Sequence, residues 1–203
     1  MSYLGELRDF FRYGYERRGR WGFAIYRTVY TIESETLFPI AVQRLDRYLK
    51  EGFKNYGTPE NRKEEEAQLL SQIKQQNVNN EVLENKEKFE NATFDELRAH
   101  FEEWIEAKDE ENRWFGAGAR VFIVVDQEAL ESIVGAPEEP YLPLEDNIVE
   151  FSRYFTKVVD RDYSVEPYPI PPEGYHGWVR ASLFDLWLLY HYMDEESLKL
   201  YDN

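Results

Sequence analysis

The spacing of hydrophobic side chains predicts four strands along the chain. Residues 21–30 read WGFAIYRTVY, in which β-branched and aromatic side chains recur with a period of two. Residues 121–125 read VFIVV, a continuous apolar run that indicates a strand buried on both faces. Two shorter strands are predicted over the second half of 151–162 and over 177–183. The pattern of 77–86 fits either a short strand or the end of a helix.

Helices are predicted where apolar residues recur at three- and four-residue spacing. Such a stripe covers 35–51, with Ser34 as the candidate N-cap and Gly52 at the C-terminal end. The sequence Thr93-Phe94-Asp95-Glu96 has the form of a capping box, and it predicts a helix over 94–107. The other predicted helices cover residues 128–134, after a capping Asp126, and residues 184–193.

The predicted strands and helices, among which no internal repeat is visible, are interpreted as an α+β fold. The expected sheet is mixed or mostly antiparallel, has about four strands, and carries on one face the helices at 35–51, 94–107 and 183–193. A ferredoxin-like β-α-β arrangement is the nearest named architecture. One α+β domain is expected over 20–203, preceded by an N-terminal arm or short helix over 1–19.

The balance of charged side chains narrows the classes of partner. The chain has 40 acidic and 24 basic side chains and a formal net charge of −16. Nucleic-acid backbones and anionic membranes would repel it, so we expect neither as a direct partner. The chain contains no cysteine, which excludes disulfides, thiol catalysis and cysteine-based metal sites. The N-terminal residues contain no apolar segment of signal-peptide length, and we expect a cytoplasmic protein, with the nucleus left open.

The acidic residues are concentrated in one segment. Residues 126–147 contain seven acids and no base. Such a run is usually a solvated face; the sharper interpretation is a docking surface for a basic protein partner. The first twenty residues instead place five arginines among aromatic side chains, in an arm that is a candidate for self-association into a homo-oligomer. The candidate residues of the acidic docking surface are Glu128, Glu131, Glu138 and Glu139.

A second set of residues is a candidate ligand pocket, formed by Arg27, Asp160, His176 and Trp178. Arg27 shares a predicted strand face with apolar side chains, where it must pair either with a structural carboxylate or with an anion at the base of a pocket. His176 follows a proline-rich loop and is the best-placed histidine for acid–base chemistry. Asp160 and Asp162 are too few for a calcium loop, and the histidines lack metal-ligand spacing, so we expect no metal and no cofactor.

Several blocks of sequence together resemble one family of proteins. The blocks are RWGFAIYR at 20–27, the segment 89–104, FIVVDQEAL at 122–130, KVVDRDY at 157–163, and GWV at 177–179 followed by LW at 186–187. In order and spacing they resemble a family of uncharacterised fungal cytoplasmic proteins, from residue 20 to residue 192. The resemblance supports a strand at 157–162 but implies no activity, because that family has no assigned reaction. The loop before Gly177 departs from the family, because it is proline-rich where a more acidic loop is expected.

The sequence leaves two main hypotheses for function. The leading one is a non-catalytic binding or protein-interaction protein of the cytoplasm, since catalytic motifs are missing and the acidic residues are segregated. The alternative is a cofactor-independent enzyme that acts on a small organic molecule in an aromatic-lined pocket, with Arg27, Asp160 and His176 as its polar groups. Convergence of these three residues on one apolar cavity would favour the enzyme. An acidic mimic of nucleic acid is a third, less favoured hypothesis.

Overall fold

The computed structural model describes residues 22–55, 79–108, 117–140, 153–163 and 174–194. The N-terminal arm at 1–19 lies outside the described residues, as does most of the proline-rich loop before Gly177.

The described strands form one mixed sheet of five strands in the order β2-β1-β3-β4-β5. In this sheet β1 pairs in parallel with both β2 and β3, whereas β3 with β4 and β4 with β5 pair antiparallel. The α+β class is therefore confirmed, with five strands instead of about four, because the ambiguous segment 77–86 contains β2. The strands are β1 (Ala24–Arg27), β2 (Glu81–Leu83), β3 (Val121–Val125), β4 (Phe155–Asp160) and β5 (Trp178–Ser182).

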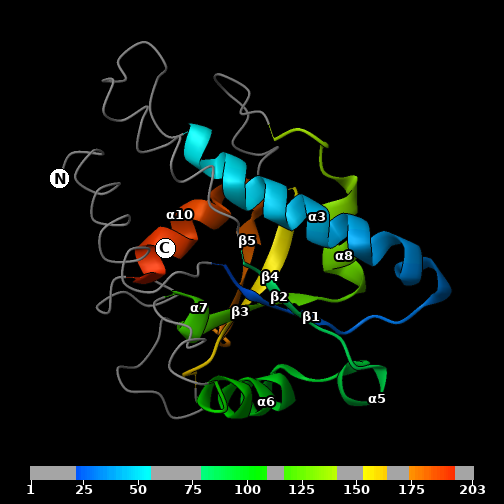
Figure 1. Cartoon of the computed structure of the whole chain (residues 1–203), viewed down its shortest axis with the longest axis vertical. Coiled ribbons are helices and arrows are strands. Elements are labelled where there is room, and N and C mark those ends of the chain that lie inside the picture. The colour runs from blue at the N-terminus through cyan, green and yellow to red at the C-terminus, as the bar shows by residue number, and fades with distance from the viewer. Residues whose placement is uncertain (1–21, 56–78, 109–116, 141–152, 164–173, 195–203) are drawn as a thin grey trace.

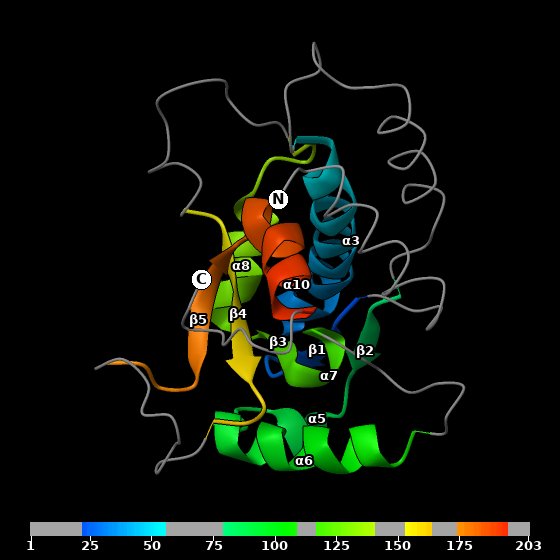
Figure 2. The ribbon, with the colours of Figure 1, turned by 90° about the vertical axis from the view of Figure 1, so that its left-hand side faces the viewer.

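Helices cover both faces of this sheet (Figures 1 and 2). On one face lie α3 (Ile32–Asn55), α8 (Gln127–Gly135), α10 (Leu186–Asp194), the short α7 (Ala117–Arg120) and the 3-10 turn η3 (Leu183–Asp185). On the other face lie α5 (Lys86–Phe89) and α6 (Phe94–Glu106). Within the part of the chain that the structure describes, none of these helices combines the length and apolar character needed to cross a membrane.

The expectation that all helices share one face is wrong for α6. The reason lies in β3, whose five residues are all buried. Ile123 packs in the core beneath α3 and α8, whereas Phe122 packs against Phe101 of α6 with ring centres 4.8 Å apart. A strand that is apolar on both faces must be covered on both, so α6 closes the second face.

The order of elements also differs from a ferredoxin-like β-α-β-β-α-β arrangement. The first three strands are separated by helices and pair in parallel, and the two antiparallel strands come last. Parallel neighbours need a long crossover connection, and here α3 joins β1 to β2 while α5 and α6 lie between β2 and β3. Because these two crossovers lie on opposite faces, the strand order reverses between β1 and β3.

The local signals for helix ends are mostly confirmed. Thr93 and Glu96 form the predicted capping box at the start of α6, and Asp126 caps α8 by accepting a hydrogen bond from the backbone of Ala129. The predicted ends of α3 are wrong, because Ser34 lies inside the helix and donates its backbone N–H to the Thr31 hydroxyl. The helix also continues past Gly52.

Candidate functional site

An open cleft of about 600 Å³ lies where the carboxyl ends of β1 and β3 meet. Parallel strands place their following loops at the same edge, and in doubly wound sheets ligands bind at this reversal of strand order. The loop after β1, the loop before α6, the start of α8 and one residue of β4 all contribute side chains. The lining residues are Thr28, Val29, Asn91, Ala92, Thr93, Phe94, Val124, Asp126, Gln127, Glu128 and Lys157.

Backbone hydrogen bonds fix the walls of this cleft. The N–H of Thr28 donates to the carbonyl oxygen of Val125 at 3.1 Å, which extends the pairing of β1 with β3 beyond Arg27. The N–H of Asn91 donates to the carbonyl oxygen of Thr28 at 3.1 Å, which ties the loop before α6 to the loop after β1. Asn91 has a φ of 57°, a left-handed conformation that asparagine adopts more readily than most residues. Main-chain contacts therefore join the loop after β1, the loop before α6 and the end of β3.

The charged part of the cleft is a network of four side chains. Lys157 lies on β4 opposite Val124 and is only 8% exposed. Its Nζ lies 2.5 Å from Oδ2 of Asp126 and 2.9 Å from Oε2 of Glu128. Arg180, its cross-strand neighbour on β5, places Nη2 2.5 Å from Oε1 of Glu128. Two carboxylates and two cations thus neutralise one another.

The network moves the pKa values of Lys157 and Glu128 away from neutrality. Burial by itself would lower the pKa of Lys157, but the hydrogen bonds and charges of Asp126 and Glu128 outweigh it, so the pKa is raised. The pKa of Glu128 is lowered, first by the hydrogen bond from Lys157; burial opposes this, and the charge of Lys157 and the contact with Arg180 lower the pKa further. Both side chains therefore stay charged throughout the physiological pH range.

Apolar side chains form the remainder of the cleft wall. Phe94, the first residue of α6, packs against Trp178 of β5 with ring centres 5.4 Å apart. Lys157 Nζ lies 5.6 Å from the centre of the Trp178 ring, so the ammonium rests on an aromatic face. The cleft combines this apolar wall with hydroxyl, amide and charged groups, an arrangement typical of small-molecule sites.

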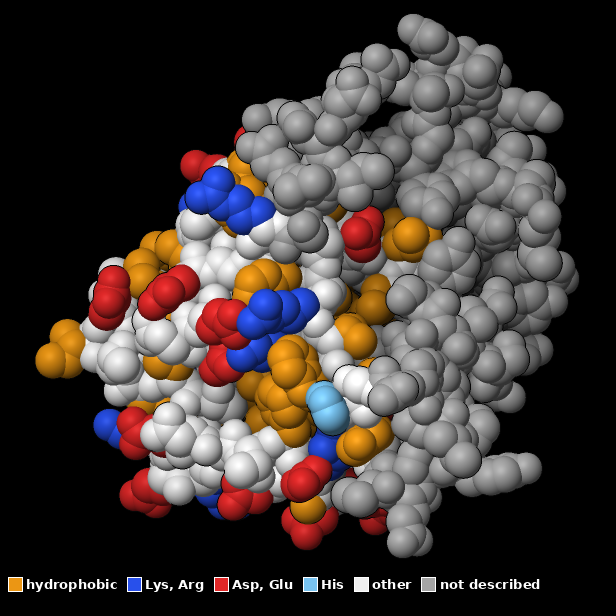
Figure 3. Space-filling model, turned by 180° about the vertical axis from the view of Figure 1, so that it is seen from behind, with side chains coloured by type: hydrophobic (Ala, Val, Ile, Leu, Met, Phe, Trp, Pro, Cys, Tyr) orange, Lys and Arg blue, Asp and Glu red, His pale blue; other side chains and the backbone are white. Residues whose placement is uncertain are grey.

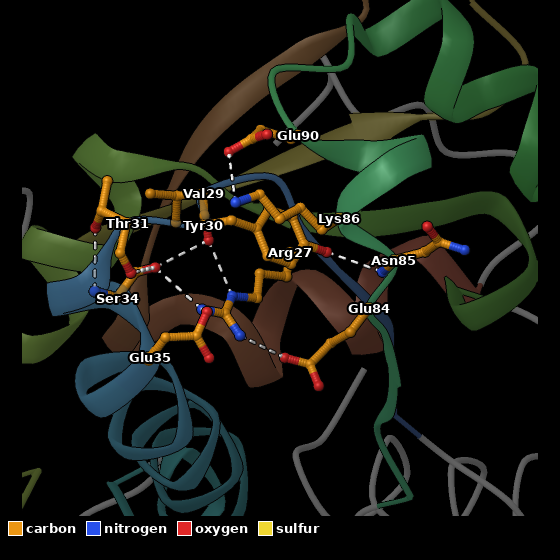
Figure 4. Close-up of polar contacts among 10 residues, drawn as sticks. All are labelled: Arg27, Val29, Tyr30, Thr31, Ser34, Glu35, Glu84, Asn85, Lys86 and Glu90. Carbon is orange, nitrogen blue, oxygen red and sulfur yellow. Dashed lines mark hydrogen bonds and ion pairs between the residues drawn. The ribbon is translucent and has the colours of Figure 1, made fainter.

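Arg27 does not contribute to the cleft and instead joins three elements (Figure 4). Its side chain is 7% exposed, and Nε donates to the carbonyl oxygen of Val29 at 2.9 Å. Nη2 contacts Ser34 Oγ at 3.0 Å and Glu35 Oε1 at 2.8 Å, both on α3. Nη1 contacts Glu84 Oε1, just after β2, at 3.0 Å. Arg27 is thus paired with structural partners, one of the two alternatives that its place in the sequence left open.

The other three candidate pocket residues lie near one another but away from Arg27. Asp160 pairs with Val121 at the start of β3, whereas Arg27 pairs with Val125 at its end. The Asp160 carboxylate accepts hydrogen bonds from the Tyr175 hydroxyl and from the backbone N–H two residues later. His176 is exposed in the loop before β5. The structure therefore does not bring Arg27, Asp160 and His176 to one cavity, and of the four candidates Trp178 alone adjoins the cleft, through Phe94 and Lys157.

The four candidate acidic-surface residues have different surroundings. Glu128 belongs to the cleft network, and Glu131 accepts a hydrogen bond from Gln127. The side chains of Glu138 and Glu139 are 78% and 80% exposed and lie near Arg47 of α3. On the face opposite that of Figure 1, acidic and basic side chains lie next to one another (Figure 3). The described part of that face is a surface of mixed charge.

The residues that line the cleft were only partly visible in the sequence. Asp126 was recognised as a helix cap, and Glu128 as an acidic surface residue, but neither was assigned to a pocket. Lys157 had one signal: it is a cation in the strand of Phe155 to Val159, where it stands beside Thr156 among apolar residues. Such a cation must find carboxylates across the strand or beyond its edge.

Comparison with known proteins identifies no relative, since no family model, no curated protein and no solved structure matches the chain. The resemblance to fungal cytoplasmic proteins therefore stays a prediction.

Proposed function

We propose that this chain is a non-catalytic binding protein of the cytoplasm and that a small molecule occupies the cleft between β1 and β3. The observation that carries the proposal is the position of the cleft at the reversal of strand order. Its volume of about 600 Å³ lies within the range of small-molecule sites. Its main-chain framework is already closed by hydrogen bonds, so binding requires little ordering of the walls.

The electrostatics of the cleft support binding over catalysis. A general acid or base works best with a pKa near the operating pH. Lys157 and Glu128 have pKa values moved the other way, and no histidine is among the described residues that line the cleft. The ammonium of Lys157 is held protonated, which makes it a hydrogen-bond donor and not a nucleophile.

The test uses the full chain, dialysed to equilibrium against a small-molecule extract of cells and then analysed by mass spectrometry. Gln127 is exposed at the mouth of the cleft, so Gln127→Trp should fill the mouth without disturbing the core. Gln43→Trp is the matched control, because Gln43 is also exposed but lies on α3 and is not among the residues that line the cleft. We expect one class of compound to be enriched by the wild type and the control and lost with Gln127→Trp. Absence of enrichment, or equal enrichment by Gln127→Trp, would refute the proposal.

A basic protein partner is a second proposal, supported by the exposure of Glu138 and Glu139. Arg47 donates to the backbone carbonyl of Glu138 at 2.8 Å, which holds this turn against α3 while leaving both carboxylates in solvent. We expect a protein that co-purifies with the wild type to be lost on reversal of these two charges. A companion retained by the Glu138→Lys, Glu139→Lys variant would count against this surface.

A further inference from the structure

We infer that the ligand of the cleft is a neutral polyhydroxylated molecule, a sugar or a related polyol. This inference rests on the proposed function and adds the chemical class of the ligand. It follows from three properties of the described lining: its charge balance, its mixture of donors and acceptors, and its apolar wall.

The charge balance disfavours an ionic ligand. Lys157 and Arg180 are already paired with Asp126 and Glu128, so an anion would have to approach two carboxylates, and a cation would have to compete with two internal cations. Removing a partner from such a pair leaves a partly buried charge uncompensated. This costs more free energy than a contact with the ligand contributes. A neutral ligand leaves the four-residue network intact.

The helix N-termini at the cleft are also already occupied by carboxylates of the chain itself. At α6, Oε2 of Glu96 accepts hydrogen bonds from the backbone N–H and the hydroxyl of Thr93, both at 2.8 Å. At α8, Oδ1 of Asp126 accepts from the N–H of Ala129 at 3.0 Å. The positive ends of both helix dipoles are thus compensated internally, so neither helix is set up to hold a phosphate.

The polar groups that remain suit hydroxyl groups. An ammonium has three N–H donors, and two of those of Lys157 are accounted for by Asp126 and Glu128. Each carboxylate oxygen has a second lone pair, and the Asn91 amide adds donors and an acceptor. The Thr28 hydroxyl donates to the carbonyl oxygen of Val125 at 3.4 Å and can accept from a ligand. Adjacent hydroxyls of a polyol both donate and accept, so they can bridge neighbouring donors and acceptors without carrying charge.

The apolar wall suits the C–H face of a sugar ring. Val29, Ala92 and Val124 line the cleft beside Phe94, whose ring is braced by Trp178. A pyranose or inositol ring presents carbon-bound hydrogens on its faces and hydroxyls at its rim. Such a ring can therefore pack against Phe94 while its rim reaches Lys157 and Asp126.

The experiment titrates the full chain with defined probes, followed by saturation-transfer NMR. The neutral probes are glucose, ribose, maltose and myo-inositol; the charged probes are inorganic phosphate, acetate and spermidine. We expect saturable binding of at least one neutral probe, with an affinity that changes little with salt because no net charge is neutralised. Thr28→Val and Glu128→Gln should each weaken that binding about threefold to tenfold, because the first removes a hydroxyl and the second replaces an acceptor oxygen by an NH2 donor, both at nearly constant shape.

The outcomes separate this inference from the proposed function. If a neutral probe binds to the wild type and to Gln43→Trp but not to Gln127→Trp, the result supports both the inferred ligand class and the proposed function. Binding of only phosphate, acetate or spermidine at the cleft overturns the inference on ligand class and leaves the cleft as a binding site. Binding of a neutral probe that is insensitive to Gln127→Trp overturns the inference, and failure of every probe together with no enrichment from the cell extract overturns both.

Discussion

The hydroxyl of Tyr26 lies 2.9 Å from Nδ1 of His100, at the centre of the contact between the sheet and α6. Tyr26 is fully buried, and burial raises the pKa of its phenol, so the phenol stays protonated and shares a hydrogen bond with the His100 ring. The His100 ring also packs edge-on against Phe89, with ring centres 4.9 Å apart. This polar pair is embedded in the aromatic cluster that holds α6 on the sheet.

The pH dependence of stability should report this pair. The pKa of His100 is lowered from its ordinary value of 6.5, first by burial and then by Lys88, against a smaller opposite effect of Glu103. Protons therefore bind more tightly to the unfolded state, so the stabilisation is complete above the unfolded pKa and is lost as pH falls through the folded pKa. We expect the unfolding free energy from urea titrations to fall between about pH 7.5 and about pH 5.5, and to fall less in His100→Gln. His176→Gln, at an exposed position, should keep the wild-type profile. If the stability of His100→Gln and of the wild type depended on pH in the same way, the pH dependence could not be assigned to His100.

Gly177→Ala should destabilise the protein far more than Gly174→Ala. Both glycines have a positive φ, of 78° and 88°. A Cβ at Gly177 would lie 2.3 Å from Cγ of Tyr163 and 2.4 Å from Nη2 of Arg98, whereas no atom of the described residues lies within 4 Å of one at Gly174. We expect a loss of about 1 kcal/mol at Gly174 from the backbone alone and at least about 2 kcal/mol more at Gly177. Chemical denaturation followed by tryptophan fluorescence measures both, and equal losses would show that Arg98 and Tyr163 move aside freely.

Arg27→Met should cost about 2–3 kcal/mol of unfolding free energy, because it removes the charged, buried donor to Val29 and Ser34, which then keep only neutral hydrogen bonds such as the one between them. The methionine keeps much of the apolar contact of the arginine stem, so the loss reports mainly the polar contacts. Lys86→Met is the control, since the ammonium of Lys86 is exposed and lies 3.8 Å from Glu90. That exposed pair should contribute about 0.5 kcal/mol or less. A loss at Arg27 no larger than at Lys86 would show that the Arg27 contacts do not anchor α3 to β1.

Lys157 and Glu128 should be energetically coupled. A double-mutant cycle of Lys157→Met and Glu128→Gln is expected to give an interaction free energy of about 0.5–1 kcal/mol, limited by solvent screening on the exposed side of Glu128. The control cycle pairs Lys157→Met with Glu131→Gln, on the same helix but hydrogen-bonded to Gln127 instead. The interaction free energy from this control cycle should be close to zero. Coupling of the same size in both cycles would indicate a long-range charge effect and not the contact in the cleft.

Features with local causes could be predicted from the sequence. The capping box at Thr93, the cap at Asp126 and the buried strand at 121–125 depend on neighbouring residues, and each is present as expected. The start of α3 was misplaced because Thr31 and Ser34 are both good capping residues, and the choice depends on Arg27, which bonds to the Ser34 hydroxyl from another element. At the start of α3, a contact with a residue of another element decides between two local capping signals.

The candidate site shows the same difference between features with local causes and features that depend on distant contacts. The sequence by itself determined most of the strands and longer helices, but not β2, α5 or α7, and it determined that Arg27 must be paired. It did not determine that Thr28, Asn91, Asp126 and Lys157 line one cleft, because these residues come from four separate segments of the chain. Only the tertiary structure decided this, through the parallel pairing of β1 with β3 and the antiparallel return of β4. Strand pairing is settled by the burial of apolar surface on both faces of the whole sheet, a property that no single segment carries.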